Sequence, residues 1–118
     1  MAAYQSTYRF ARISARKVRP IADLIRGKKA DEALTILQFQ PQRGARLLEK
    51  VLKSALGNAQ DPDHPSNKGR SVNLHGLIVR QAHVDGGPMF KRVRPHARGM
   101  AFMIRRRFSH IHVTLEEQ

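Results

Sequence analysis

Residues 86–115 read GGPMFKRVRPHARGMAFMIRRRFSHIHVTL, and this segment is the most informative part of the sequence. It contains seven Lys and Arg residues and no Asp or Glu. Because like charges repel one another, the segment cannot neutralise itself by folding compactly, and its counter-charge has to come from outside the segment. The densest polyanion in a cell is a nucleic acid backbone. The segment therefore predicts a nucleic-acid-binding protein and not an enzyme.

The composition of the whole chain agrees with this interpretation. The 118 residues include 22 Lys and Arg against 9 Asp and Glu, which gives a net charge of +13 and a pI of about 11.5. A domain this basic has the charge expected of a phosphate binder. The absence of cysteine excludes disulfide scaffolds, thiolate zinc sites and cysteine nucleophiles, and favours the cytoplasm. No apolar run is as long as a membrane span, so we expect no membrane contact.

Two long strands are predicted around the turn in this segment. In residues 72–84, and again in residues 100–108, the even-numbered positions are mostly apolar, which is typical of half-buried strands. Turn residues at Pro95 and Gly99 would join them into a hairpin. With about ten residues of each arm beyond the domain, at about 3.3 Å each, the hairpin reaches on the order of 30 Å. Its order is expected to come largely from what it binds, because an isolated ribbon is marginal in water.

The alternation in these strands is irregular at two places. In the first strand, Leu77 and Val79 fall on the face opposite Ile78 and Ala82, which indicates partial burial of both faces. In the second strand, the apolar positions change from even to odd numbers within residues 108–111. A slip of one residue moves apolar side chains to the other face, so we predict a β-bulge or a sharp twist there.

The first half of the chain is predicted to form one strand and three helices. Residues 4–10 alternate with a period of two. A helix follows between the N-cap residue Ser14 and the terminating residue Gly27, and Pro20 inside it predicts a kink or a late start. Further helices are expected from residue 30 to Pro41 and over residues 42–60, where a wide apolar stripe predicts the core helix.

These elements define the predicted fold class. Residues 61–73 are rich in Pro, Asp, Asn, Ser and Gly and are expected to form a loop. The chain is predicted to be α+β, with a small antiparallel three-stranded sheet packed against three helices and a long protruding β-hairpin. We expect a single domain over residues 1–118, in which residues 1–85 and 108–118 form the body and residues 86–107 form the hairpin.

Catalytic and metal-binding constellations are weak in this sequence. The carboxylates are scattered, so no acid and base pair is visible. His110 and His112 are the best chemical candidates, because residues i and i+2 of a strand point the same way, but no third ligand is apparent. No glycine-rich segment has the spacing of a phosphate-binding loop. We therefore expect no enzyme activity, no cofactor and no bound metal, and a structural or RNA-contacting role for the histidines.

Positive residues cluster at the N-terminus as well as in the hairpin. The first 22 residues contain no acidic residue, and Arg outnumbers Lys in the chain, which suits bidentate phosphate recognition. No helix-turn-helix, zinc-finger or basic-zipper signature is present, so folded RNA is favoured over DNA. A further basic row on the third helix is more typical of a solvated surface. It consists of Arg43, Arg46, Lys50 and Lys53.

Three blocks of the sequence resemble a known family. Residues 14–28, SARKVRPIADLIRGK, closely resemble the signature helix of the bacterial large-subunit ribosomal protein twenty-two family. Residues 50–59, KVLKSALGNA, resemble its third helix. Residues 91–111 resemble its hairpin, with Lys91-Arg92, Pro95 and Gly99 in the first part and RFSHI at residues 107–111. Together the blocks extend over nearly the full length of the chain.

The resemblance implies a structural protein of the large ribosomal subunit in the cytoplasm. Such a protein binds 23S ribosomal RNA with its body near the tunnel exit, supports subunit assembly and lines the polypeptide tunnel with its hairpin. The implied partners are the RNA, neighbouring large-subunit proteins and the nascent polypeptide, with no homo-oligomer. The implied tunnel-lining tip consists of Met89, Phe90, Lys91, Arg92, Val93, Arg94 and Pro95.

The expected RNA contacts combine the two cationic clusters with basic residues in and beside the matching blocks. From the first half of the chain they are Arg9, Arg12, Arg16, Lys17, Arg19, Lys28 and Lys29. From the second half they are Lys91, Arg92, Arg94, His96, Arg98, Arg105, Arg106, Arg107 and His110.

Two other function classes fit parts of the sequence. A free-standing RNA or DNA chaperone would act on many RNAs in isolation, whereas a ribosomal protein should co-sediment with large subunits and resist salt washing. A metal-dependent nuclease using His110 and His112 would show metal-dependent cleavage that is lost in His110→Ala. We favour the ribosomal protein because the cationic hairpin and the three matching blocks point to it together.

Overall fold

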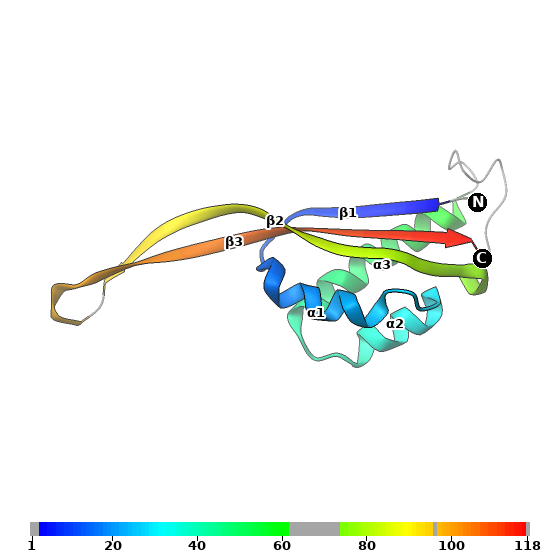
Figure 1. Cartoon of the computed structure of the whole chain (residues 1–118), viewed down its shortest axis with the longest axis horizontal. Coiled ribbons are helices and arrows are strands. Elements are labelled where there is room, and N and C mark those ends of the chain that lie inside the picture. Colours follow the sequence, from blue (N-terminus) through cyan, green and yellow to red (C-terminus); the bar gives the residue numbers. More distant parts are fainter. Residues whose placement is uncertain (1–2, 62–73, 96, 118) are drawn as a thin grey trace.

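A computed structural model describes residues 3–61, 74–95 and 97–117 of the chain. The described strands form one antiparallel sheet in the order β1-β3-β2, and the α-helices cover one face of it, which confirms the α+β prediction (Figure 1). The molecule measures 65 × 27 × 16 Å, because β2 and β3 continue as a paired ribbon well beyond the helices. The elements are β1 (Ala3–Ala11), α1 (Ala15–Ile25), α2 (Ala30–Phe39), α3 (Arg43–Gln60), β2 (Leu77–Pro95) and β3 (Ala101–Glu117), with 3-10 turns at Leu74–Gly76 and Ala97–Gly99.

The hydrophobic core lies between the sheet and the helices. Helix α3 buries Leu48, Leu52 and Ala55, which are spaced at i, i+4 and i+7, so the predicted apolar stripe is confirmed. The central strand β3 buries Ile111 and Leu115 from the other side. Full burial of each large aliphatic side chain contributes about 1.5–3 kcal/mol, and this packing fixes the body independently of the ribbon.

The ends of helix α1 agree only in part with those predicted from the sequence. Gly27 has a φ of +81°, a left-handed conformation that favours glycine, and it ends the helix as predicted. Ser14 occupies the N-cap position, but its side chain makes no capping hydrogen bond, so the predicted cap is wrong in that respect. Pro20 lies inside a helix that already begins at Ala15, and the predicted late start is therefore wrong.

Helix α2 has two acidic residues, Asp31 and Glu32, in its first turn, where they complement the helix dipole. The backbone N–H of Glu32 donates a hydrogen bond to Asp31 Oδ1 at 2.9 Å. This hydrogen bond holds the pKa of Asp31 below its ordinary value, and the neighbouring His75 adds to the effect. The apolar side of the helix, with Ala33 and Leu37, is buried.

Strand β2 starts later and is less regular than predicted. The strand begins at Leu77, after a 3-10 turn, while the predicted start at Val72 and nearly all of the predicted loop lie outside the described residues. The pairing with β3 shifts between Val79 and Gln81. This bulge brings Leu77 and Val79 onto the same buried side as Ala82, so the predicted assignment of these residues to opposite faces is wrong.

The bulge predicted within residues 108–111 of β3 lies on the neighbouring strands instead. β3 keeps a regular alternation, in which Ser109, Ile111 and Val113 are all buried. The extra residues are on β1, between Tyr8 and Ala11, and on β2, between Gly86 and Met89. The apolar pattern of β3 changes because the helices end at this level. Phe10 marks the β1 bulge with a φ of +59° and is 58% exposed, so the period-two alternation of burial expected over residues 4–10 ends before this residue.

The bulge of β2 permits a close approach of two backbones. A Cβ atom on Gly87 would lie 3.0 Å from the carbonyl oxygen of Phe108, so this position has no room for a side chain. At the far end of the ribbon, Arg98 and Gly99 both have positive φ, at 62° and 71°, and the strands resume pairing at Pro95 and Ala101. The predicted turn between Pro95 and Gly99 is confirmed, apart from His96, which lies outside the described residues.

Among the helices described here, none combines the length and the apolar character that crossing a membrane requires.

Candidate nucleic-acid interface

A basic cleft lies where the ribbon leaves the body. It has a volume of about 760 Å³ and is bordered by the β1–α1 connection, the first residue of α3 and both arms of the hairpin. The rings of Phe90 and Phe108 meet edge to face in its wall, with centroids 5.1 Å apart. No carboxylate of the described residues lines the cleft, so its positive potential is concentrated as a phosphate site requires. Its cationic lining residues are Arg12, Lys17, Arg43, Arg105, Arg106 and Arg107.

The fold brings these cations together from three distant parts of the sequence. Arg12 and Lys17 flank the sharp connection between β1 and α1. Arg43 begins α3, and its Nη2 donates a hydrogen bond to the carbonyl oxygen of Arg12 at 2.7 Å. Residues 105–107 follow on β3, opposite residues 89–91 of β2. The two cationic clusters predicted from the sequence therefore meet in one place.

The hairpin cations have no carboxylate partner in the described part of the chain. The ion pairs found there that involve Lys or Arg use Arg26, Arg46, Lys53 and Arg80, which all belong to the body. In the ribbon, Lys91 lies directly opposite Arg105, and like charges facing each other across two strands destabilise the pairing. When no external anion is bound, repulsion between its own positive charges therefore destabilises the ribbon.

Several predicted RNA contacts lie away from the cleft. Arg19 Nε donates to the carbonyl oxygen of Val84 at 3.1 Å, which ties α1 to β2. Lys28 and Lys29 are exposed beside the first residues of β2, at the end of the body remote from the ribbon. Arg9, Arg16, Lys91, Arg92, Arg94 and Arg98 are exposed, His110 is half-buried, and His96 lies outside the described residues.

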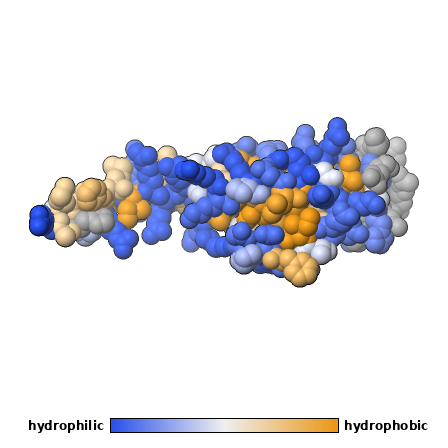
Figure 2. Space-filling model, turned by 60° about the horizontal axis from the view of Figure 1, so that its bottom comes forward, coloured by the Kyte–Doolittle hydropathy of each residue, from blue (hydrophilic) through white to orange (hydrophobic). Residues whose placement is uncertain are grey.

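The segment predicted as the tip, residues 89–95, begins at the base of the ribbon, opposite Arg107, and ends at the turn after Pro95. Its surface is exposed and chemically mixed. Met89, Phe90 and Val93 are 46%, 50% and 71% exposed, and they alternate with cations along the same arm. Arg92 lies over the ring of Phe90, with its guanidinium carbon 5.3 Å from the centroid. Figure 2 shows this mixture of hydrophilic and hydrophobic residues on the ribbon, in contrast to the mainly hydrophilic rim of the body.

Known proteins are similar to this chain over almost its whole length. The family model of Ribosomal protein L22p/L17e matches residues 6–116. The chain belongs to this family. It is 61% identical to large ribosomal subunit protein uL22 of Rhodopirellula baltica, over 98% of this chain and 95% of that protein. It is 50% identical to uL22 of Caldicellulosiruptor saccharolyticus, over 96% and 87%, and 43% identical to uL22 of Akkermansia muciniphila, over 97% and 96%.

Membership of the L22p/L17e family confirms the resemblance seen in the sequence. The family is structural and non-enzymatic, and its members are components of cytoplasmic ribosomes. The positive charge of the cleft and the ribbon therefore has to be explained by a structural role and not by catalysis.

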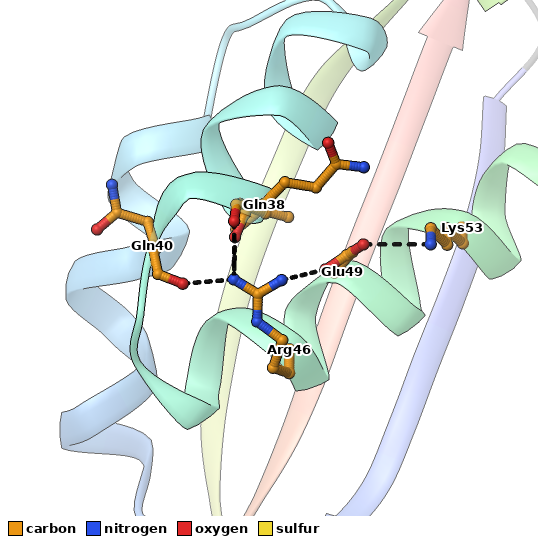
Figure 3. A network of polar contacts seen from close by, with 6 residues as sticks. Gln38, Gln40, Arg46, Glu49 and Lys53 are labelled. Carbon is orange, nitrogen blue, oxygen red and sulfur yellow. Dashed lines mark hydrogen bonds and ion pairs between the residues drawn. The ribbon is translucent and has the colours of Figure 1, made fainter.

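Two arginines of helix α3 have roles that the sequence did not reveal. The row of basic residues on this helix predicted a solvated surface, but Arg43 lines the cleft and Arg46 binds the protein itself. Arg46 Nη2 donates to the carbonyl oxygens of Leu37, Gln38 and Gln40, where α2 ends (Figure 3). A helical period shows which residues share a face, but not which carbonyl groups of another helix, here the preceding α2, lie beside that face.

The same arginine belongs to a network of charges along α3. Arg46 Nη1 pairs with Glu49 Oε2 at 2.9 Å, and Lys53 Nζ pairs with Glu49 Oε1 at 3.1 Å (Figure 3). Glu49 thus holds the guanidinium group of Arg46 in place. The guanidinium group caps the carbonyl end of α2, where the helix dipole favours a cation. Arg46 is a structural residue of the body, in contrast to the unpaired arginines of the ribbon.

His110 and His112, the two histidines considered for metal binding, have different hydrogen-bond and ion-pair partners. The Nδ1 atom of His110 accepts a hydrogen bond from the backbone N–H of Phe10 at 3.1 Å. His112 lies instead beside Asp85 and His83, with Nε2 3.2 Å from Asp85 Oδ2. The described residues therefore do not join the predicted pair in one cluster, and the carboxylate and second imidazole beside His112 come from β2, which the sequence pattern did not indicate.

Replacing Arg46 with methionine should destabilise the body without weakening RNA binding. The Arg46→Met variant keeps an unbranched apolar stem but loses the donors to the end of α2 and the ion pair with Glu49. Since the group is about half exposed, we expect a loss of about 1–2 kcal/mol in the free energy of unfolding, measured by urea denaturation. Lys50→Met, one turn further along α3, is the control and should change stability by less than about 0.5 kcal/mol. Equal stability of the two variants would contradict the structural role of Arg46.

Proposed function

We propose that this chain is a structural constituent of the large ribosomal subunit that binds 23S ribosomal RNA. Membership of the L22p/L17e family and the names of its relatives support the assignment to the large subunit. The observation that carries the RNA-binding part is the basic cleft, in which six cations from three segments converge without a carboxylate of the described residues. The chain works in the cytoplasmic ribosome, beside other proteins of the large subunit.

RNA phosphates neutralise the cleft and the ribbon in this proposal. Arginine binds phosphate through two parallel N–H donors, and several of the cleft cations are arginines. The exposed ring of Phe90 and the half-buried ring of Phe108 beside them offer surfaces on which an unpaired base can stack. Binding of this kind reads the shape of folded RNA and the positions of its phosphates, and it needs no base sequence.

The body and the ribbon have different roles in this proposal. The body, residues 1–85 and 108–118, seats the protein on the RNA, and residues 86–107 form the ribbon that reaches inward. Residues 89–95, which run along β2 from the base of the ribbon to its turn, line the polypeptide tunnel and border the nascent chain. The mixed exposed surface of the tip supports this role, because a passage for many sequences is served by cations and apolar groups in alternation.

Support of subunit assembly follows from the same electrostatics. A ribbon that repels itself becomes ordered when RNA supplies the counter-charge, and in turn it holds the RNA segments that it contacts. Binding and ordering are then one event, so the protein acts while the RNA is being folded. No cofactor, homo-oligomer or catalytic residue has a part in this proposal.

Removal of the three arginines at the base of the ribbon should weaken RNA binding and lower its dependence on salt. In the variant with Arg105, Arg106 and Arg107 replaced by Ala, up to three phosphate contacts are lost. The slope of log K against log salt concentration should then become shallower by about 2 to 3, because each contact contributes about 0.7–0.9. The measurement is the affinity for 23S ribosomal RNA over a series of salt concentrations.

A variant of equal charge provides the control for this measurement. Replacing Lys50, Lys53 and Arg80 with Ala also removes three positive charges, but from body positions outside the cleft. Its slope should stay close to that of the unmodified chain. An equal loss of slope in both variants would mean that only the net charge matters, and the assigned contacts would be wrong.

The position of the tip is tested by cross-linking. A photoreactive amino acid at Val93, which is 71% exposed, should cross-link to a radiolabelled nascent chain in stalled ribosomes. The same amino acid at Lys53, exposed on the outer surface of α3, should give no such product. Cross-links of equal yield from both positions, or from neither, would contradict a tunnel-lining tip.

A further inference from the structure

Three potential metal ligands lie together on the sheet face that points away from the helices. His83 of β2 is directly opposite His112 of β3, and Asp85 follows His83 by two residues on the same side of β2. Ala82 and Val84, the neighbours of His83 in the sequence, are buried against the helices, so the three ligands face outward. Two strands of one sheet thus present an imidazole pair and a carboxylate at a single place.

The distances between these side chains are those of a nearly formed metal site. Asp85 Oδ2 lies 3.2 Å from His112 Nε2 and 4.0 Å from His83 Nε2, and the three ligand atoms are all within 4.8 Å of one another. The two imidazole rings are stacked, with centroids 4.6 Å apart and planes inclined by 16°. Each residue is at least partly exposed, so small rotations can bring the atoms closer.

A second contact prepares His112 for binding a metal. Its Nδ1 atom lies 3.1 Å from the hydroxyl oxygen of Thr7 on β1. When Nδ1–H donates to this hydroxyl oxygen, the lone pair of Nε2 is free and points to the side where Asp85 lies. A hydrogen bond at the remote ring nitrogen is the usual support of a histidine ligand, because it fixes the tautomer and the orientation of the ring.

We propose that His83, Asp85 and His112 bind a zinc ion, with water completing the coordination. Imidazole and carboxylate are ordinary zinc ligands, and bonds of about 2.0–2.2 Å in a tetrahedron place ligand atoms about 3.3–3.6 Å apart. The Asp85–His112 distance of 3.2 Å already meets this requirement, and His83 has to move closer by less than 1 Å relative to Asp85. The net charge of +13 opposes binding of a dication, so the site is weaker than a closed structural zinc site.

The position of the site suggests what the ion does. Asp85 immediately precedes the bulge between Gly86 and Met89, where the ribbon leaves the body. A zinc ion held by β2 and β3 at this level cross-links the two strands and fixes their register at the base of the ribbon. The ion therefore stabilises the paired strands just before the segment in which like charges face each other.

Calorimetric titration of the full-length chain with zinc sulfate tests the proposal. We expect one ion per chain, and at least tenfold weaker binding in His83→Ala and in Asp85→Asn, since each variant removes one ligand. His110→Ala is the matched control, because His110 lies on the same side of β3, two residues from His112. Its Nδ1 accepts the Phe10 N–H, so the ring proton is on Nε2 and no lone pair is free; zinc affinity should be unchanged in this variant.

A spectroscopic measurement identifies the ligands directly. In nitrogen-edited NMR spectra of the imidazole groups, zinc should shift the signals of His83 and His112 and leave those of His110 in place. Far-UV circular dichroism of each variant shows that the sheet is retained. Absence of saturable zinc binding, equal affinity in all variants, or loss of affinity in His110→Ala to the same extent as in His83→Ala would overturn the proposal.

Discussion

The arginines of the ribbon and its lysine, Lys91, have no carboxylate partner among the described residues, and the order of the ribbon depends on this. A two-stranded ribbon is only marginally stable by itself, and here Lys91 faces Arg105 across the pairing. Such an element can be maintained in a protein if another molecule supplies the anions. The L22p/L17e family consists of ribosomal proteins, and ribosomal RNA provides phosphate at the density that this charge requires.

The body of the molecule holds the ribbon at a fixed place and in a fixed direction. The core between α3 and the sheet ends at the level of Ser109, and at the same level β1 and β2 each carry a bulge. Bulges increase the local twist, so the ribbon leaves the body at an angle that the two extra residues set. The close approach of Gly87 to the backbone of Phe108 belongs to this junction. Beside it, Arg43 and Arg12 join the cleft to the body, and the phosphate-binding groups are therefore placed by rigid elements.

Much of this structure could be predicted from the sequence, because the signals were periodic or compositional. The stripe of α3, the alternation at the start of β1 and the turn at Gly99 each follow from local rules. The errors concern partners distant in the chain. The bulge predicted in β3 lies on its neighbours, since a change of apolar phase shows where the core ends but not which strand carries the extra residue. Likewise, the role of Arg46 and the meeting of His83, Asp85 and His112 depend on pairings that no local pattern contains.

Hydrogen exchange of the full-length chain, free and bound to 23S ribosomal RNA, tests most directly whether the ribbon depends on an external anion. In the free chain, amides of residues 88–107 should exchange much faster than those of α3 and of the β3 residues beside it, because the body has its own core. Binding of RNA should slow the exchange of the ribbon by at least tenfold and change the body little. Ribbon amides that are already as protected as those of the body in the free chain would contradict the account.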